Sequence, residues 1–179
     1  MKGLIEHSLN THNDSRGNLT EIFRGGWISD SGPVQWNYVR SKANVLRGFH
    51  LHHTHTDYLV VLEGLMHLVL KDLRPESETY LKSKQLKLSG AKLTMVEIAP
   101  GIGHGFYFPT PSNFVYGVSH YWNRNDELGC RWDDPLLEVE WEVNNKTPIL
   151  SDTDTNASDF KVMLERFHAL RSQSGKENS

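Results

Sequence analysis

The chain has 179 residues, of which 37% are hydrophobic and 23% are charged, which is typical of one globular domain rather than a disordered segment. Its formal net charge is −3, which argues against a strongly basic surface for nucleic acid. No apolar run approaches the roughly 20 residues of a membrane helix, and the first ten residues lack the apolar centre of a secretion signal. The single cysteine, Cys130, excludes an internal disulfide framework. We therefore expect a cytoplasmic protein with neither nucleic-acid nor membrane partners.

Most of the chain predicts short β-strands separated by glycine and proline residues. The expected strands are residues 18–23, 32–38, 58–62, 65–70, 78–88, 93–98, 105–108 and 114–121. The segments 58–62 and 65–70 lie on either side of Glu63-Gly64 and predict a hairpin. Strands of this length, repeated about every 8–12 residues, favour an antiparallel sandwich or a small barrel, and hence an all-β fold.

The C-terminal part changes to a helical pattern. Apolar residues recur there at helical spacing, namely Phe160, Met163, Leu164, Phe167 and Leu170. Ser158 is the expected N-cap, so we predict one amphipathic helix over 158–170 that packs on the barrel or on a partner subunit. The interpretation is one domain over residues 1–171, followed by a flexible polar tail over 172–179.

Histidine is the unusual residue of this sequence. The chain has ten, and four of them fall within six residues: His50, His52, His53 and His55. On a strand, His50 and His52 project from the same face because they are two residues apart. A turn at Pro100-Gly101 delivers His104 to the start of another strand. Two histidine-bearing strands that converge in a small barrel predict a pocket with polar groups in an apolar wall.

Two kinds of chemistry remain open for this pocket. His50, His52, Asp57 and His104 form a ligand set suited to one divalent transition metal. Alternatively, a histidine oriented by a carboxylate can remove a proton without any metal. The remaining histidines of the run, His53 and His55, are also consistent with a solvated loop that has no ligand role, although this is the less favoured interpretation.

Sequence blocks that occur in a fixed order resemble the dTDP-4-dehydrorhamnose 3,5-epimerase family. They are Asp14-x-Arg16-Gly17 with Glu21 and Phe23, Gln35-x-Asn37, Leu46-Arg47-Gly48-Phe49-His50, Asp72-Leu73-Arg74 with Ser77, Thr79 and Tyr80, Pro100-Gly101-x-x-His104-Gly105-Phe106, Tyr116, Tyr121, Glu127-x-Gly129 with Trp132 and Asp134-Pro135, Trp141, and Leu150-Ser151-x-x-Asp154. The resemblance covers about Asp14 to Asp154. It implies that the chain is a divergent member of the family. It also implies a cupin jelly-roll fold and a homodimer with an exchanged N-terminal segment.

The resemblance also implies a reaction and its residues. The family acts on a nucleotide-linked 4-keto-6-deoxy sugar in deoxysugar and polysaccharide biosynthesis, epimerising C3, C5 or both through an enolate. In this chain His50 corresponds to the base, Asp154 to its orienting carboxylate, and Tyr116 to the proton donor, with no cofactor required. The residues that correspond to substrate contacts are Arg16, Glu21, Gln35, Asn37, Arg47, His104 and Glu127. Of these, Arg16 and Glu21 would reach into the pocket of the neighbouring subunit.

Three positions depart from the family pattern inside the expected site. Asp57 stands where the family has a lysine that stabilises the enolate oxygen, His52 replaces a glutamine, and Trp122 replaces a tyrosine. A carboxylate at position 57 would oppose the developing negative charge. Two alternatives therefore stay open. One is a metal-dependent cupin, or an enzyme similar to the dTDP-sugar 3,4-ketoisomerases, using His50, His52, Asp57 and His104. The other is a sugar-nucleotide binding protein without catalysis.

Overall fold

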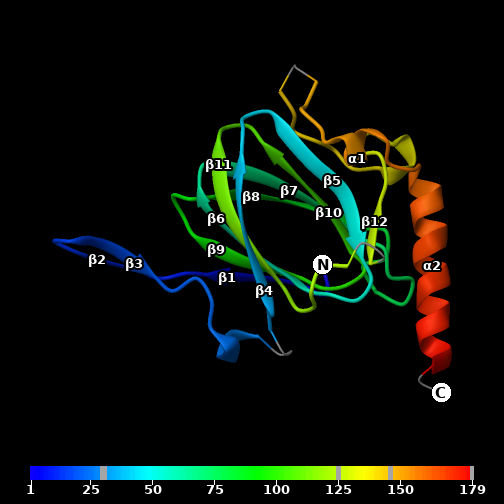
Figure 1. The fold of residues 1–179 in the computed structure, drawn as a ribbon, viewed down its shortest axis with the longest axis horizontal. Helices are drawn as coiled ribbons and strands as arrows, with labels where there is room; N and C mark the ends of the chain where they lie inside the picture. Colours follow the sequence, from blue (N-terminus) through cyan, green and yellow to red (C-terminus); the bar gives the residue numbers. More distant parts are fainter. Residues whose placement is uncertain (29–31, 124–125, 145–146, 178–179) are drawn as a thin grey trace.

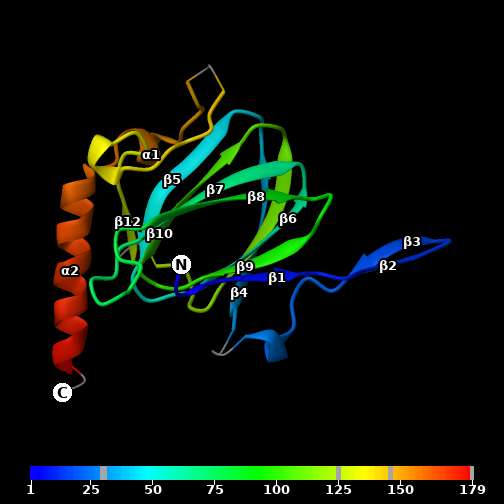
Figure 2. The ribbon, with the colours of Figure 1, turned by 180° about the vertical axis from the view of Figure 1, so that it is seen from behind.

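Two antiparallel sheets of five strands each form the barrel in a computed structural model that describes residues 1–28, 32–123, 126–144 and 147–177 (Figures 1 and 2). The first sheet runs in the order β1 (Leu4–Ser8), β9 (Thr94–Ile98), β6 (Asp57–Glu63), β11 (Ser112–Val118) and β4 (Gln35–Ser41). The second runs in the order β12 (Glu127–Gly129), β5 (Val45–His52), β10 (Ile102–Phe108), β7 (Leu65–Asp72) and β8 (Ser83–Ser89). The predicted all-β jelly roll is confirmed.

The apolar faces of the two sheets meet in the main core. Side chains from both sheets pack together there, including Leu59 and Phe114 from the first sheet and Met66, Leu68 and Phe108 from the second. Each of these side chains is almost fully buried. Such burial provides the main driving force that holds two facing sheets together.

The predicted hairpin of residues 58–62 and 65–70 is wrong. The strands β6 and β7 follow one another in the chain but belong to opposite sheets: β6 pairs with β9 and β11, whereas β7 pairs with β8 and β10. Gly64 joins them with a φ of +80°, and a Cβ atom there would lie 2.3 Å from Ser112 Oγ. Only glycine allows this conformation beside so close a neighbour, so the chain can pass directly from one sheet to the other.

A long helix, α2 (Phe160–Glu177), packs on the outer face of the second sheet at its β12–β5 edge (Figure 1). Its side chains Phe160, Met163 and Phe167 are buried against Leu51 and Leu128 of β5 and β12 in a second core. The helix thus packs on the barrel, one of the two predicted locations. No described helix is both long enough and apolar enough to cross a membrane.

The ends of α2 differ from the prediction. The hydroxyl of Ser158 donates a hydrogen bond to the carbonyl of Gly129, while Asp134 Oδ2 accepts the backbone N–H of Phe160 at 2.8 Å. The expected cap at Ser158 is therefore wrong, because a carboxylate 26 residues earlier in the chain takes that role. The helix also continues past Arg171 to Glu177, where the sequence predicted a flexible tail; residues 178–179 lie outside the described part.

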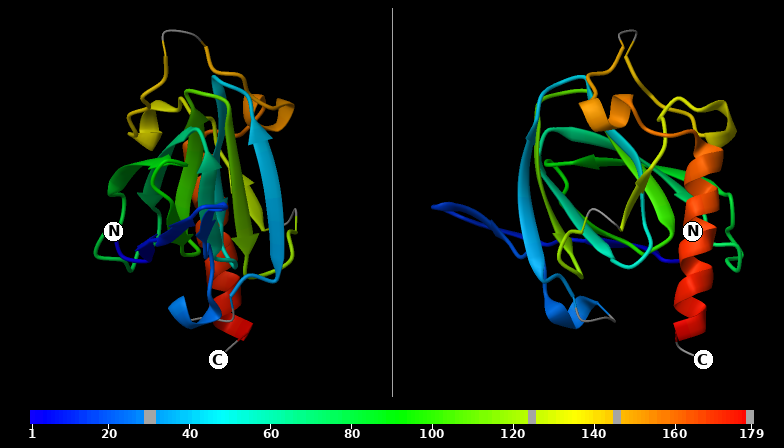
Figure 3. Two further views of the ribbon diagram at one scale, coloured as in Figure 1. Left: turned by 90° about the vertical axis from the view of Figure 1, so that its left-hand side faces the viewer. Right: turned by 45° about the vertical axis from the view of Figure 1, so that its right-hand side comes forward.

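A two-stranded hairpin of β2 (Thr11–Asp14) and β3 (Gly17–Thr20) extends away from the barrel (Figures 1 and 2). Its side chains are exposed along almost its whole length. The remaining short elements are the 3-10 turns Gly25–Trp27 and Pro135–Leu137 and the helix α1 (Asp152–Thr155). Helix α1 lies beside β5 at one end of the barrel (Figure 3), which brings the C-terminal region to the cavity described next.

Candidate active site

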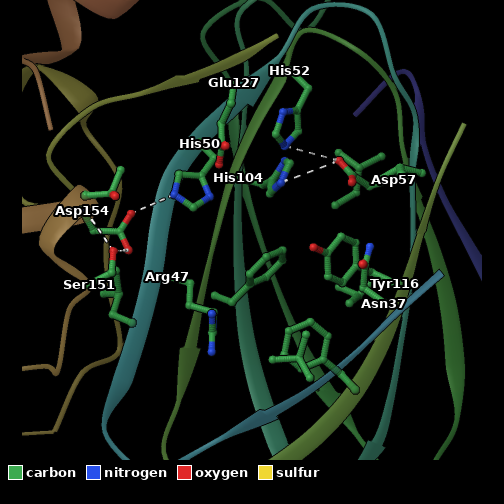
Figure 4. Close-up of a pocket in the computed structure, with 18 of the residues that line it drawn as sticks. Asn37, Arg47, His50, His52, Asp57, His104, Tyr116, Glu127, Ser151 and Asp154 are labelled. Atoms are coloured by element: carbon green, nitrogen blue, oxygen red, sulfur yellow. Dashed lines mark hydrogen bonds and ion pairs between the residues drawn. The ribbon is translucent and has the colours of Figure 1, made fainter. Parts of the chain in front are cut away.

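A cavity of about 510 Å³ lies between the two sheets, within the usual range for a small-molecule site. Strands of both sheets and helix α1 contribute to its wall (Figure 4). Most of the site residues predicted from the sequence line this cavity, namely Asn37, Arg47, His50, His52, Asp57, His104, Tyr116, Glu127 and Asp154.

His50 and Asp154 form a hydrogen-bonded pair on one side of the cavity. Nε2 of His50, on β5, lies 2.8 Å from Oδ1 of Asp154 on α1. The hydroxyl of Ser151 donates to the other carboxylate oxygen at 2.8 Å. Burial would raise the pKa of Asp154, but the hydrogen bonds from His50 and Ser151 outweigh it and lower that pKa. An ionised carboxylate only accepts, so Nε2 of His50 carries the hydrogen and Nδ1 keeps a free lone pair.

Tyr116 faces this pair from the opposite sheet. It lies on β11, between Asn37 of β4 and Leu59 of β6 in the strand register. Its hydroxyl points into the cavity (Figure 4). Burial and the nearby Asp57 carboxylate raise the pKa of the Tyr116 phenol. The phenol therefore keeps its proton at neutral pH, so a base and an acid stand on opposite sides of one cavity.

Polar side chains at other points of the wall are held by neighbouring residues. Nε of Arg47 donates to Ser41 Oγ at 3.2 Å, which fixes one edge of its guanidinium group. Gln35 Nε2 donates to Asn37 Oδ1 at 3.0 Å. Glu127 accepts the indole N–H of Trp122 at 3.1 Å, so the residue in place of the family tyrosine is tied to a predicted substrate contact.

A second charged group occupies another part of the wall and consists of His52, Asp57 and His104. Nε2 of His52 lies 3.9 Å from Asp57 Oδ2, and Nε2 of His104 lies 3.7 Å from the same oxygen (Figure 4). All three side chains are buried or almost buried, and their ligand atoms lie within 4.8 Å of one another. The metal set predicted from the sequence also included His50, whose Nε2 is instead bonded to Asp154. We call His52, Asp57 and His104 the histidine–aspartate cluster.

The ionisation of the cluster follows from its burial. Burial lowers the pKa of His52 to about 3, against the opposing effect of Asp57. Burial likewise lowers the pKa of His104. Asp57 shows the opposite balance, because burial would raise its pKa but the neighbouring histidines lower it. Two neutral imidazoles therefore stand beside one carboxylate.

His55 is a buried residue of the site, contrary to the possibility of a solvated loop. Its Nδ1 lies 2.7 Å from Asp126 Oδ2, and its Nε2 lies 3.6 Å from Asp57 Oδ1. Burial alone would lower the pKa of His55, but Asp126 and Asp57 raise it to about 9. Asp126 also accepts bonds from Thr54 and pairs with His53. The sequence interpretation missed Asp126, which is 71 residues from His55 and has no local motif.

Two predicted substrate contacts lie outside the cavity of their own chain. Arg16 is in the turn of the β2–β3 hairpin, where its side chain is 88% exposed and pairs with Asp14. Glu21 follows that hairpin and pairs with Arg24. The single chain therefore does not bring Arg16 or Glu21 to His50. Gln35, a third predicted contact, does not line the cavity either; it donates to Asn37 Oδ1 and accepts the backbone N–H of Trp122, and both of these residues line it.

Comparison with known proteins identifies the relatives of this fold and site. A family model described as dTDP-4-dehydrorhamnose 3,5-epimerase matches residues 1–162. The chain belongs to this family. The dTDP-4-dehydrorhamnose 3,5-epimerase of Shigella flexneri is 31% identical over 131 residues, which cover 71% of each chain. The resemblance inferred from the sequence blocks is thus confirmed, and identities of this size fit a divergent member.

Solved structures of epimerases share the fold of this family member. The dTDP-6-deoxy-D-glucose-3,5-epimerase of Legionella pneumophila, in complex with dTDP-4-keto-L-rhamnose, has a TM-score of 0.85 and 27% identity, with 93% of both chains covered. The 3'-monoepimerase ChmJ of Streptomyces bikiniensis, in complex with dTDP-quinovose, has a TM-score of 0.83 and 26% identity. That comparison covers 97% of this chain and 94% of ChmJ. These relatives are isomerases that epimerise sugars, which places the chain in the same enzyme class.

Proposed function

We propose that this chain epimerises a dTDP-linked 4-keto-6-deoxy sugar at C3, C5 or both, with His50 removing a proton and Tyr116 returning one. The observation that carries the proposal is the hydrogen bond of 2.8 Å between His50, on one sheet, and Asp154 of helix α1. Tyr116 faces this pair from the other sheet. Relatives named as epimerases of such sugars, two of them solved with dTDP-sugars, support the choice of substrate.

The base in this reaction is Nδ1 of His50. Because Asp154 holds the hydrogen on Nε2, the lone pair of Nδ1 is available for a substrate proton (Figure 4). The 4-keto group of the sugar acidifies the hydrogens on its two neighbouring carbons. Removal of one of them leaves a positive imidazolium beside the Asp154 carboxylate, which stabilises the positive charge. Both proton transfers balance with His50, Tyr116 and the substrate alone.

Tyr116 returns a proton on the other face of the sugar ring. Its raised pKa keeps the phenol protonated in the resting enzyme, so it can act as the acid. Delivery from the face opposite His50 inverts the carbon, whereas return from His50 restores the original configuration. The opposite placement of the two residues therefore accounts for epimerisation rather than simple exchange.

Arg47 is the proposed partner of the diphosphate. It lies on β5 together with His50, three residues away, and lines the same cavity. Since Ser41 occupies only Nε, one edge of the planar guanidinium group is held in place for the other edge to meet an anion. A forked cation of this kind suits phosphate oxygens. Asn37 and Glu127 are the further proposed contacts from the same wall, whereas His104 can reach the sugar only through Nε2, the atom that also faces Asp57.

The function is tested by proton exchange with solvent. The chain is incubated in D₂O with dTDP-4-keto-6-deoxyglucose and with related nucleotide-linked keto sugars, and C3 and C5 are followed by NMR. We expect deuterium at one or both carbons, and the labelled carbon identifies the position that reacts. Binding without deuterium at either carbon, for every sugar tried, would instead indicate a binding protein and refute the proposal.

We also propose a homodimer in which Arg16 and Glu21 complete the pocket of the other subunit. The β2–β3 hairpin that carries Arg16 extends away from the barrel, and Leu19 on it is 62% exposed (Figure 1). On the first sheet, Trp36 and Tyr38 of the edge strand β4 are also exposed. An exposed hairpin arm and an apolar sheet edge on one chain fit an exchanged-arm dimer.

Mixed subunits test this arrangement. Arg16→Ala and His50→Ala variants are each expected to lose epimerisation when assayed alone. If the arm completes the other subunit's site, a refolded mixture regains activity, since heterodimers contain one pocket with both native residues. Light scattering on the wild type measures the oligomeric state. A monomer, or a mixture as inactive as its components, would contradict the dimer.

A further inference from the structure

The histidine–aspartate cluster has the geometry of a site that holds a cation. Its three ligand atoms, Nε2 of His52, Nε2 of His104 and Oδ2 of Asp57, converge from β5, β10 and β6. The two contacts to Asp57 measure 3.9 and 3.7 Å, which is too long for hydrogen bonds. We propose that these three atoms bind one divalent first-row transition ion in the wall of the substrate cavity.

The hydrogen bond on the far side of His104 fixes which atom faces Asp57. Nδ1 of His104 lies 3.2 Å from the backbone carbonyl of Ile102. A carbonyl only accepts, so Nδ1 carries the hydrogen and Nε2 presents a lone pair. Nε2 lies 3.7 Å from a carboxylate oxygen, and two such acceptors repel each other unless a cation or a hydrogen-bond donor lies between them. A backbone carbonyl behind the imidazole is also the usual support of a metal-binding histidine.

The spacing of the three atoms fits a common ion. Metal–ligand lengths of about 2.1 Å at angles of about 90° to 110° place two ligand atoms about 3.0 to 3.4 Å apart. The observed contacts of 3.7 and 3.9 Å need only a small contraction to reach that separation. Two imidazoles and one carboxylate suit Fe, Mn, Co, Ni or Zn better than Mg or Ca, which prefer oxygen ligands.

A second group of possible ligands, His52, His55 and Asp126, does not have a carboxylate oxygen left for a cation. There the carboxylate of Asp126 accepts from His55 at 2.7 Å and from Thr54 Oγ1 at 2.5 Å. Its oxygens are already used in hydrogen bonds, whereas those of Asp57 face imidazoles at 3.6 Å or more. The pair of Asp126 and His55 therefore supports Asp57 from behind, in the way that outer residues orient metal ligands.

The cluster lies beside the proposed base. His104 is directly opposite His50 in the register of β5 and β10, and both residues line the same cavity. His50 is bonded to Asp154 and stays outside the ligand set, so base and ion occupy separate places. A divalent ion here would supply positive charge close to the oxygen that becomes negative during proton removal. Only this catalytic role depends on the proposed function; the metal site depends on the geometry of the cluster.

Cobalt binding tests the site without any substrate. Untagged protein is treated with chelator, and Co²⁺ is added in a calorimeter and in a visible spectrophotometer. We expect about one equivalent to bind, with absorption bands of ligand-field transitions. Asp57→Asn and His104→Gln should each weaken binding at least about tenfold, while Glu127→Gln, in the same cavity, and His12→Gln, on the exposed hairpin, should bind as wild type does. Thermal unfolding with and without Co²⁺ gives a second reading of the same affinity.

The outcomes separate the metal site from the proposed function. Absence of binding by folded wild type, or equal binding by wild type and both cluster variants, would overturn the metal site. For the catalytic role, removal of Co²⁺ from wild type should slow solvent exchange about 10²-fold. Site-specific binding with an unchanged exchange rate would overturn that role alone. Absence of exchange in both forms would refute the proposed epimerisation, whereas the binding result would still report on the metal site.

Discussion

The two charged groups of the cavity differ in how closely their members approach. Nε2 of His50 and Oδ1 of Asp154 lie 2.8 Å apart, and Ser151 donates to the second carboxylate oxygen, so only Nδ1 of His50 is left for the substrate. His52, Asp57 and His104 stand 3.7 to 3.9 Å apart around one carboxylate oxygen. The first group needs no added component to hold a base in position. The second has no hydrogen bond between its members, and the protonated His55 lies 3.6 Å from the other carboxylate oxygen, so its open geometry can accept the proposed cation without requiring one.

His50→Ala is the strongest test of the first group. Removing the base should lower solvent exchange at C3 and C5 by about 10⁴-fold, the upper end of what general-base catalysis supplies. Exchange in D₂O by NMR measures the effect. As a control, Glu165→Gln changes an exposed residue of α2, away from both the cavity and the hairpin, and should exchange at the wild-type rate. If the His50→Ala variant remained active, the base would have to be a residue of the histidine–aspartate cluster instead.

Asp154→Asn should have the next largest effect, about 10³-fold on the exchange rate. The amide group can donate to Nε2 of His50, which would shift the hydrogen to Nδ1 and remove the lone pair that faces the substrate. The same exchange assay measures the loss, and circular dichroism checks the fold. A variant as active as wild type would show that His50 is oriented by some other contact.

Tyr116→Phe separates the two proton transfers. We expect about a 10²-fold loss of inverted product, because the phenyl ring cannot donate a proton. Exchange through His50 alone should persist, since abstraction and return on one face do not use Tyr116. The ratio of exchange to product formation, measured in one NMR experiment, reports this difference. Equal losses in both quantities would contradict the division of roles between the two residues.

The sequence predicted the parts of the site that depend on local spacing. His50 and His52 lie on one strand, β5, and His104 lies on β10, as the period of two and the Pro100-Gly101 turn indicated. Contacts between distant segments of the chain could not be predicted from spacing. Nothing in the spacing pairs His50 with Asp154, 104 residues away, and only the family resemblance suggested that contact.

The sequence also could not show which neighbours a strand or loop would have. Residues 58–62 and 65–70 are two apolar runs on either side of Glu63-Gly64, a pattern that predicts a hairpin, but Gly64 sends the two strands into opposite sheets. The polar run after β5 resembles a solvated loop, yet the buried pairing with Asp126 holds His55 inside. In both cases the deciding contact comes from another segment of the barrel, and no local pattern records it.

A third charged group, around Asp72, extends the comparison to stability. The Asp72 carboxylate is fully buried and accepts hydrogen bonds from Arg74, Ser77 and Thr79. Asp72→Asn should lower the free energy of unfolding by about 2 kcal/mol at pH 7, because a neutral amide replaces a satisfied charge. Urea unfolding measures this difference.

The pH dependence of that difference follows from the pKa of Asp72. Burial would raise this pKa, but the hydrogen bonds from Arg74, Ser77 and Thr79 outweigh it and lower it in the folded chain. The stabilisation is therefore fully present above the unfolded pKa of about 3.9 and declines as the pH falls further toward the folded value. Wild type and Asp72→Asn should differ equally at pH 7 and pH 5, and the difference should be smaller at pH 3. A constant difference at all three values would show that the charge contributes nothing.

Ser151→Ala should have the smallest effect and tests whether the first group is complete without its third member. The hydroxyl donates to Asp154 Oδ2 at 2.8 Å and accepts the Asp154 backbone N–H at 3.0 Å. Its loss should cost about 1 kcal/mol of stability as a missing helix cap. The exchange rate should fall only about threefold, since the other carboxylate oxygen still holds His50. A loss as large as that of Asp154→Asn would show that Ser151, rather than the carboxylate alone, keeps the imidazole in its reactive orientation.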